Sequence, residues 1–252
     1  TSNISVIKLN FNGEKIAEKE YAGDGNDTVF GIYPFNEGII LFGNSKSKTG
    51  IYKDISESDF FAYADKNLEV KWVYSAGAGI SIPGEAFYAH EGNIYTAAVK
   101  YEKDIANWVL IKVNDKGEEV WRSQFEANIR PVDINSFNDG LIVAARKSYT
   151  DGYLYSIDNE GNMSKLCEGP EYLADKIYRT NDGGFITTAS RIIKTVNQPV
   201  YISAIWYDTE NVVTKYDSNL KTLWRKTYDR VKDDRGTDVI LPLADSRLVV
   251  SK

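Results

Sequence analysis

Residues 107–125, NWVLIKVNDKGEEVWRSQF, form a unit that the rest of the chain repeats. An apolar run rich in β-branched and aromatic residues leads into an Asp-Lys-Gly turn, where the glycine supplies a positive φ. A second run follows, which alternates polar and apolar residues and contains Trp121. This order predicts a strand, a tight turn and a second strand.

Four other stretches of the sequence resemble this unit. Two of them share the pattern Asp-x-Asn-Leu-x-x-x-Trp, and two are looser copies: 63–72 YADKNLEVKW, 215–224 KYDSNLKTLW, 9–16 LNFNGEKI and 156–163 SIDNEGNM. A second kind of hairpin alternates with these units and carries a glycine, or once an arginine, between apolar residues: 35–42 FNEGIILF, 90–95 HEGNIY, 137–143 FNDGLIV, 180–186 TNDGGFI and 243–250 LADSRLVV.

The spacing of these second hairpins predicts the architecture. Their reference residues follow one another at intervals of 54, 48, 44 and 63 residues: Gly38, Gly92, Gly140, Gly184 and Arg247. Each interval contains four candidate strands, which is the content of one propeller blade. The longest interval contains an insertion at residues 191–211, between the second and third strands. Its aromatic part, residues 201–207, is either part of the insertion or itself the third strand, displaced by a long loop.

The two ends of the sequence complement each other. Residues 4–9 and 15–21 read as the third and fourth strands of a blade, and residues 238–243 and 247–251 read as a first and a second strand. A blade shared by both ends would hide the open strand edges that β-proteins must protect. We therefore predict an all-β fold, a five-bladed β-propeller with four-stranded blades, closed by N- and C-terminal strands that share one blade. Residues 1–252 are expected to form a single domain with little helix.

Composition excludes several classes of function. The 36 acidic and 30 basic residues are scattered, with a net charge of −6, so neither nucleic acid nor insertion into a membrane is expected. Cys167 is the only cysteine, so no internal disulfide can form. His90 is the only histidine, which leaves too few residues for a multi-histidine metal site. No dinucleotide-binding loop, P-loop or nucleophile elbow is present, and we expect no cofactor apart from a structural calcium ion.

The repeats also resemble a known kind of protein. The loop 23–28 GDGNDT, the hairpins 36–43 NEGIILFG and 181–186 NDGGFI, and the stretch 215–224 resemble repeats of bacterial secreted or surface β-propellers. The spacing of aspartate and tryptophan is also similar to that of quinoprotein-like propellers. Those rings usually have more blades than the five expected here, so no quinone cofactor or catalytic residue is carried over. The resemblance implies an extracellular or cell-envelope protein with a scaffold or binding role.

One acidic residue precedes the second kind of hairpin in each repeat. These residues lie an odd number of positions before the reference residue, so in regular strands they would point to one face: Asp27, Glu85, Asp133, Asp175 and Asp238. Because the first strand of a blade lines the central channel, they would form a ring of carboxylates with raised pKa values or a bound cation. The structural alternative is that these residues cap loops.

Two functions follow from this pattern. The first is a non-enzymatic, monomeric binding domain that presents one face to a protein or glycan, with contacts from Tyr149, Tyr153, Tyr201 and Trp206. The second is a glycoside hydrolase in which Glu85 is the acid and Asp27 or Asp133 is the base, because two carboxyl groups suffice for that reaction.

The remaining repeated residues favour structural roles. Aspartates in the turns could bind a cation, but aspartate also caps turns through its own side chain: Asp65, Asp115, Asp158 and Asp217. Trp72, Trp121 and Trp224 recur with the period of the fold, and we expect them to pack between neighbouring blades.

Overall fold

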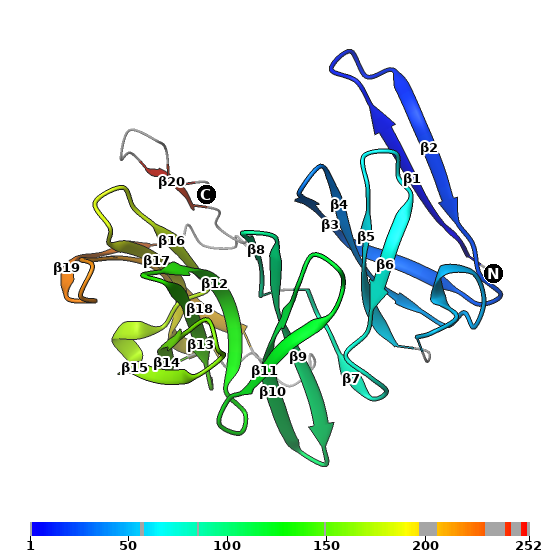
Figure 1. The fold of residues 1–252 in the computed structure, drawn as a ribbon. Helices are drawn as coiled ribbons and strands as arrows, with labels where there is room; N and C mark the ends of the chain where they lie inside the picture. Colours follow the sequence, from blue (N-terminus) through cyan, green and yellow to red (C-terminus); the bar gives the residue numbers. More distant parts are fainter. Residues whose placement is uncertain are drawn as a thin grey trace. The chain divides into compact units, whose positions relative to one another are not determined.

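The computed structural model describes residues 2–55, 58–84, 86–148, 150–196, 206–229, 240–242 and 248–250. These residues confirm the all-β class: every strand pairing is antiparallel, and the helical segments among them are two short 3-10 turns, η1 (Gly50–Tyr52) and η2 (Pro170–Tyr172) (Figure 1). None of the helices in the described part of the chain is long and apolar enough to cross a membrane. The chain divides into two compact units, residues 1–128 and 129–252.

The first unit begins with a hairpin and a four-stranded sheet. Strands β1 (Ile4–Leu9) and β2 (Lys15–Tyr21) form a sheet of two strands. The following sheet has the order β3-β4-β5-β6, with the bounds β3 (Asp27–Phe35), β4 (Gly38–Ser45), β5 (Asp59–Ala64) and β6 (Val70–Tyr74). Neighbours in this sequence of strands are also neighbours in the sheet, which is the topology of a propeller blade.

The second sheet of this unit has the same topology with a divided first strand. Both β7 (Ile80–Ser81) and β8 (Phe87–His90) pair with β9 (Asn93–Glu102). The sheet continues through β10 (Ile105–Val113) to β11 (Glu119–Gln124). Pro83 and Gly84 lie between β7 and β8, and a proline cannot donate to a strand ladder.

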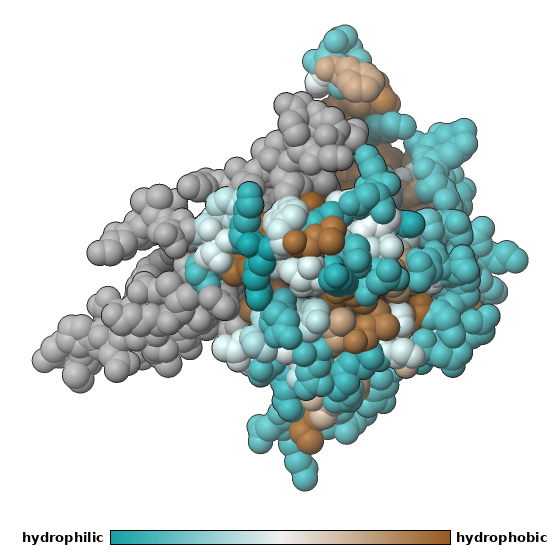
Figure 2. Space-filling view, turned by 90° about the vertical axis from the view of Figure 1, so that its left-hand side faces the viewer, coloured by the Kyte–Doolittle hydropathy of each residue, from teal (hydrophilic) through white to brown (hydrophobic). Residues whose placement is uncertain are grey.

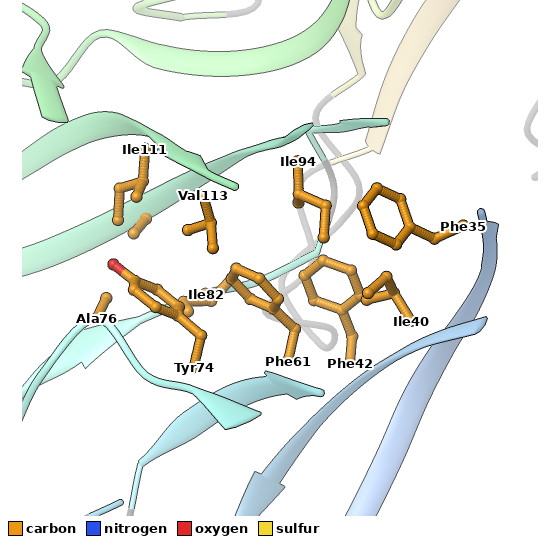
Figure 3. Close-up of a cluster of buried hydrophobic side chains, with 11 residues drawn as sticks. Phe35, Ile40, Phe42, Phe61, Tyr74, Ala76, Ile82, Ile94, Ile111 and Val113 are labelled. Atoms are coloured by element: carbon orange, nitrogen blue, oxygen red, sulfur yellow. The ribbon is translucent and has the colours of Figure 1, made fainter. Parts of the chain in front are cut away.

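The core of the first unit lies between these two sheets. Figure 3 shows Phe42, Phe61 and Tyr74 of the first sheet opposite Ile94 and Ile111 of the second. Phe42, Phe61, Ile94 and Ile111 are fully buried, and each such side chain contributes about 1.5–3 kcal/mol through the hydrophobic effect. The opposite face of the first sheet packs against the hairpin β1–β2 through a second buried cluster that includes Ile4, Tyr21 and Tyr52.

The second unit contains two further four-stranded sheets and a terminal hairpin. The first sheet comprises β12 (Arg130–Phe137), β13 (Gly140–Arg146), β14 (Gly152–Ile157) and β15 (Met163–Gly169). The second comprises β16 (Lys176–Arg179), β17 (Phe185–Val196), β18 (Trp206–Tyr216) and β19 (Thr222–Asp229). A buried cluster with Ile142, Leu154, Ile177 and Phe185 joins these sheets. Strands β20 (Ile240–Pro242) and β21 (Leu248–Val250) form a two-stranded sheet.

The predicted strands at both ends of the chain are present. Strands β1 and β2 have the expected bounds, and β20 and β21 lie within the two expected C-terminal strands. The prediction of an insertion at residues 191–211 is partly wrong, because β17 continues to Val196 and pairs with a β18 that begins at Trp206. The extra residues therefore lengthen a hairpin. Closure through a shared blade and a single domain over residues 1–252 stay predictions.

Candidate functional site

Three of the five acidic residues singled out in the sequence lie in the described part of the chain. Asp27 begins β3, Asp133 lies within β12, and Asp175 directly precedes β16. Glu85 and Asp238 lie outside the described residues, as do Tyr149 and Tyr201. Trp206 is the first residue of β18, and only its backbone is described. A ligand contact by Tyr153 requires an exposed side chain, and this expectation is wrong, because Tyr153 is only 6% exposed and stacks on Tyr155.

The Asp27 carboxyl is buried and held by Ser45, the last residue of β4, and by Ser47, two residues further on. Asp27 is 3% exposed, and it accepts hydrogen bonds from the Ser45 hydroxyl at 2.6 Å and the Ser47 hydroxyl at 2.9 Å. The Ser47 hydroxyl in turn accepts a hydrogen bond from the backbone N–H of Gly25. Gly23 is required here, because a Cβ at that position would meet the Ser47 hydroxyl at 2.2 Å. The carboxyl thus ties the loop before β3 to the end of β4.

A tyrosine hydroxyl lies in the same buried region as Asp27. Tyr52 is fully buried, and within the described residues its hydroxyl has no hydrogen-bond partner. Burial raises the pKa of Tyr52, and the nearby Asp27 carboxyl raises it further. Burial also raises the pKa of Tyr21 to about 12, and the hydroxyl of Tyr21 donates to the carbonyl of Leu68. Neither tyrosine ionises at neutral pH, so this region offers no phenolate for catalysis.

The Asp133 carboxyl joins the two sheets of the second unit. It accepts hydrogen bonds from the Ile177 N–H at 2.8 Å and the Lys176 ammonium at 3.3 Å, both from β16. Asp133 is 8% exposed, and burial raises its pKa above the usual value for an aspartate, although Lys176 and the Ile177 N–H oppose this shift. Asp59 plays a similar part in the first unit, where it accepts a hydrogen bond from the Ile82 N–H at 2.8 Å.

Asp175 is paired with an arginine. Arg146, at the end of β13, donates to one carboxyl oxygen of Asp175, and the Ser190 N–H donates to the other at 2.8 Å. The side chain of Asp175 is 34% exposed, and that of Arg146 is 20% exposed. A charged pair with two fixed donors can position an adjacent polar ligand.

The aspartates in the outer turns act as caps, as expected from the general preference of aspartate for turns. Asp65 Oδ1 accepts hydrogen bonds from the N–H groups of Asn67 and Glu69, and Asp158 and Asp217 form the same pair of bonds in their turns. The prediction for Asp115 is wrong, because Asn114 caps that turn through the N–H groups of Lys116 and Glu118. No group of three or more Asp, Glu, His or Cys residues able to hold a metal occurs among the described residues.

The expected packing role of the repeated tryptophan is confirmed for Trp72. Its indole N–H donates to the carbonyl of Asp115 in the next sheet at 2.9 Å, and its ring lies edge-on to Phe61. Trp121 lies beside Tyr95 with ring centroids 6.0 Å apart. Trp224 is 37% exposed, with the Lys226 ammonium over its ring.

Several partners of these groups were not recognised in the sequence. Ser45 and Ser47 hold Asp27, Lys176 approaches Asp133, and Arg146 pairs with Asp175. Each partner lies on another strand or beyond a loop, so sequence spacing gives no sign of the pairing. Asp27, Asp133 and Asp175, the three of these acidic residues that the structure describes, accept hydrogen bonds from other groups of the fold. That they also bind a ligand stays a prediction.

Comparison with known proteins found only distant similarities in structure. No protein-family model matches the sequence, and a search of the curated proteins found no match. A protein of unknown function from Bacteroides caccae is similar over 90% of this chain and 94% of its own, with 11% identity and a TM-score of 0.44. A subtype N10 neuraminidase-like protein of a strain from the little yellow-shouldered bat (Guatemala) is similar over 84% of this chain and 71% of its own, with 9% identity and a TM-score of 0.48. With identities and TM-scores this low, nothing about function follows from either similarity.

Proposed function

We propose that this chain is a non-enzymatic β-propeller domain of a bacterial secreted or cell-surface protein, which binds a protein or glycan on one face. The observation that carries this proposal is the internal use of Asp27 and Asp133, whose carboxyl oxygens accept hydrogen bonds from groups of the fold itself. A catalytic carboxyl must be free to exchange a proton with its substrate. The repeated residues therefore support folding, and they leave binding through surfaces and loops as the function.

We further propose that five blades close into a ring through the terminal hairpins. The hairpin β1–β2 has two strands, and the same holds for β20–β21, whereas each full sheet has at least four. On the side of β1–β2 that carries Ile7, Leu9 and Ile16, each of these residues is more than half exposed. An exposed apolar strand face of this kind is typical of a surface that another element covers.

Small-angle X-ray scattering tests the ring and the monomeric state together. A compact monomer of 252 residues has a radius of gyration of about 18 Å. An open arrangement or a dimer would give a clearly larger radius, and either would contradict the proposal. Addition of calcium in the same experiment would test whether a structural ion is needed for compactness.

One observation favours the hydrolase as a second candidate. Burial raises the pKa of Asp133, and a carboxylate is a more effective general base when its pKa lies closer to the pH at which the enzyme works. In this alternative Glu85 would be the acid, and Asp27 or Asp133 the base. Chromogenic glycosides tested with the wild type and with Glu85→Gln separate the two functions. Turnover that disappears in Glu85→Gln would establish the hydrolase, and saturable binding of a glycan or protein without turnover would support the binding domain.

A further inference from the structure

One sheet lacks the tryptophan that the others share. In three sheets a tryptophan of the fourth strand pairs with a large residue of the third: Tyr63 with Trp72, Lys112 with Trp121, and Lys215 with Trp224. In the sheet β12–β15 the corresponding pair is Ser156 with Ser164. Two small hydroxyl side chains thus stand where the other sheets carry an indole.

The position of a β-bulge explains this difference. In the other three sheets the register shifts next to the turn, immediately before the tryptophan. In β14–β15 the shift lies further along, between Leu154 and Tyr155, so that Ser164 takes the paired position and Lys165 pairs with Tyr155. Lys165 then contacts the ring of Tyr153, on the opposite face of the sheet from Ser164.

A cavity of about 380 Å³ lies at this position. We call it the Ser164 pocket, and its lining includes Phe137, Asp139, Ser156, Asp158, Glu160 and Ser164. All of these residues belong to the turns and strand ends of one sheet in the second unit. The volume is within the range of about 300–1,000 Å³ that is typical of small-molecule sites.

The lining combines apolar side chains with polar groups, several of which form no bond within the described part of the fold. Phe137 is half-buried and packs against Phe185, with the ring centroids 5.4 Å apart. Asp158 is occupied by its own turn, where it accepts hydrogen bonds from the N–H groups of Glu160 and Asn162. By contrast, within the described residues no hydrogen bond or ion pair engages the side chains of Asp139, Ser156, Glu160 or Ser164.

These groups select a class of ligand. Hydroxyls and carboxylates together can donate to and accept from the hydroxyl groups of a sugar, and the face of Phe137 can contact its C–H groups. Three acidic residues without a basic side chain in the lining repel anionic ligands such as phosphates and acidic sugars. We propose that the Ser164 pocket binds one ring of a neutral glycan. The inference rests on the proposed function, and it specifies the ligand class and its site.

Two variants test the pocket without touching the core. Ser164→Trp places in this sheet the residue that the other three carry, and it should fill the cavity. Asp139→Asn keeps the size of the side chain and removes its charge and one acceptor. Glu37→Gln is the matched control, because Glu37 occupies the equivalent turn between β3 and β4 and is also exposed. Urea midpoints and near-ultraviolet circular dichroism confirm that each variant is folded.

The measurement is a titration of each protein with neutral methyl glycosides, followed by nuclear magnetic resonance. We expect saturable binding of at least one glycoside to the wild type and to Glu37→Gln. Binding should be lost in Ser164→Trp and weakened about 2- to 10-fold in Asp139→Asn, as for the loss of one hydrogen bond.

Three results would overturn the inference. They are the absence of saturable glycoside binding, equal binding by the wild type and Ser164→Trp, and binding of the cation spermidine in place of any glycoside. Equal binding by Ser164→Trp would leave the proposed binding function intact and move its site elsewhere. If no glycoside binds but a protein partner does, the pocket inference fails, and the proposed function is retained as binding of a protein.

Discussion

Two glycines in equivalent turns give a sharp test of the packing between sheets. Gly13 lies in the turn between β1 and β2, and Gly117 lies in the turn between β10 and β11. Their φ angles are +80° and +82°, and each N–H donates to an asparagine carbonyl, of Asn10 and Asn114, at 3.0 and 3.1 Å. The two turns differ in what surrounds them. A Cβ at Gly13 would meet nothing within 4 Å, whereas one at Gly117 would lie 2.7 Å from two ring carbons of Trp72.

Substitution of each glycine by alanine therefore separates backbone strain from the contact with Trp72. Both Gly13→Ala and Gly117→Ala force an L-residue into the left-handed region, at a cost of about 1–2 kcal/mol. Gly117→Ala adds an overpacked contact, for which the usual cost is about 1–3 kcal/mol. The indole cannot escape by a rotation alone, because the Cβ of Trp72 itself would be 3.0 Å from the new methyl group. We expect Gly117→Ala to lose about 2–5 kcal/mol of unfolding free energy in total, and Gly13→Ala only the first part.

Urea denaturation followed by far-ultraviolet circular dichroism measures both values. Trp72→Ala completes a double-mutant cycle. It removes the two ring carbons and leaves only the Cβ of residue 72 at 3.0 Å, so the cost of Gly117→Ala should fall toward that of Gly13→Ala. Equal costs for the two glycine variants in the wild-type background would refute the contact. An excess cost of Gly117→Ala that is undiminished in Trp72→Ala would also refute it, since the strain would then come from another neighbour.

Three further predictions concern charged and polar groups. Because burial raises the pKa of Asp133, its contribution to stability is present below pH about 4 and is lost as the pH rises through the folded-state pKa. Asp133→Asn should therefore gain stability relative to the wild type between pH 4 and pH 7, in urea denaturation at each pH, and a difference independent of pH would contradict this. Ser45→Ala removes a donor to the buried Asp27 carboxyl and should cost about 1–3 kcal/mol of unfolding free energy, against about 0.5 kcal/mol or less for the exposed Ser5→Ala. Equal losses would argue against a buried network. Hydrogen bonds from Lys215 and Thr180 hold the pKa of Asp182 well below its usual range. In Lys215→Met we expect this pKa to lie closer to about 3.9, measured by carbon-detected nuclear magnetic resonance during a pH titration. An unchanged pKa would rule out the ion pair.

Local patterns in the sequence predicted the strands and turns well, because short-range physics determines them. The bounds of β1 and β2 follow from apolar runs interrupted by an Asn-Gly turn. The two Asp-x-Asn-Leu turns have a leucine where the turn of residues 114–118 has Gly117. These residues, Leu68 and Leu220, adopt positive φ angles of 64° and 62°. Both leucines pack against hydrophobic clusters, and this burial offsets the backbone strain.

The environment of the acidic residues was harder to predict, because it depends on neighbours from other strands. Alternation correctly placed Asp27 and Asp133 on strands, but it could not show that Ser45, Ser47 and Lys176 would meet them. Repeat spacing likewise treated residues 191–211 as an insertion, although most of their length extends an existing ladder. The sequence does not indicate the shifted bulge in β14–β15. It shows only that Lys165 stands where the other repeats have a tryptophan.

A repeated fold allows structural and functional residues to be separated by a physical criterion. Residues that recur with the repeat, such as Trp72 and the turn aspartates, stabilise the fold wherever they occur, so their recurrence needs no ligand. At the pair Ser156 and Ser164 no indole packs on the sheet, and polar groups lie beside a cavity instead. Loss of stabilising contacts in one sheet is expected where binding requires space, because stability and function compete for the same positions. If that reasoning holds, Ser164→Trp is at least as stable as the wild type and loses its ligand. A Ser164→Trp variant that is destabilised and also fails to bind would mean that the space is not shaped for an indole, and the comparison between sheets would lose its force.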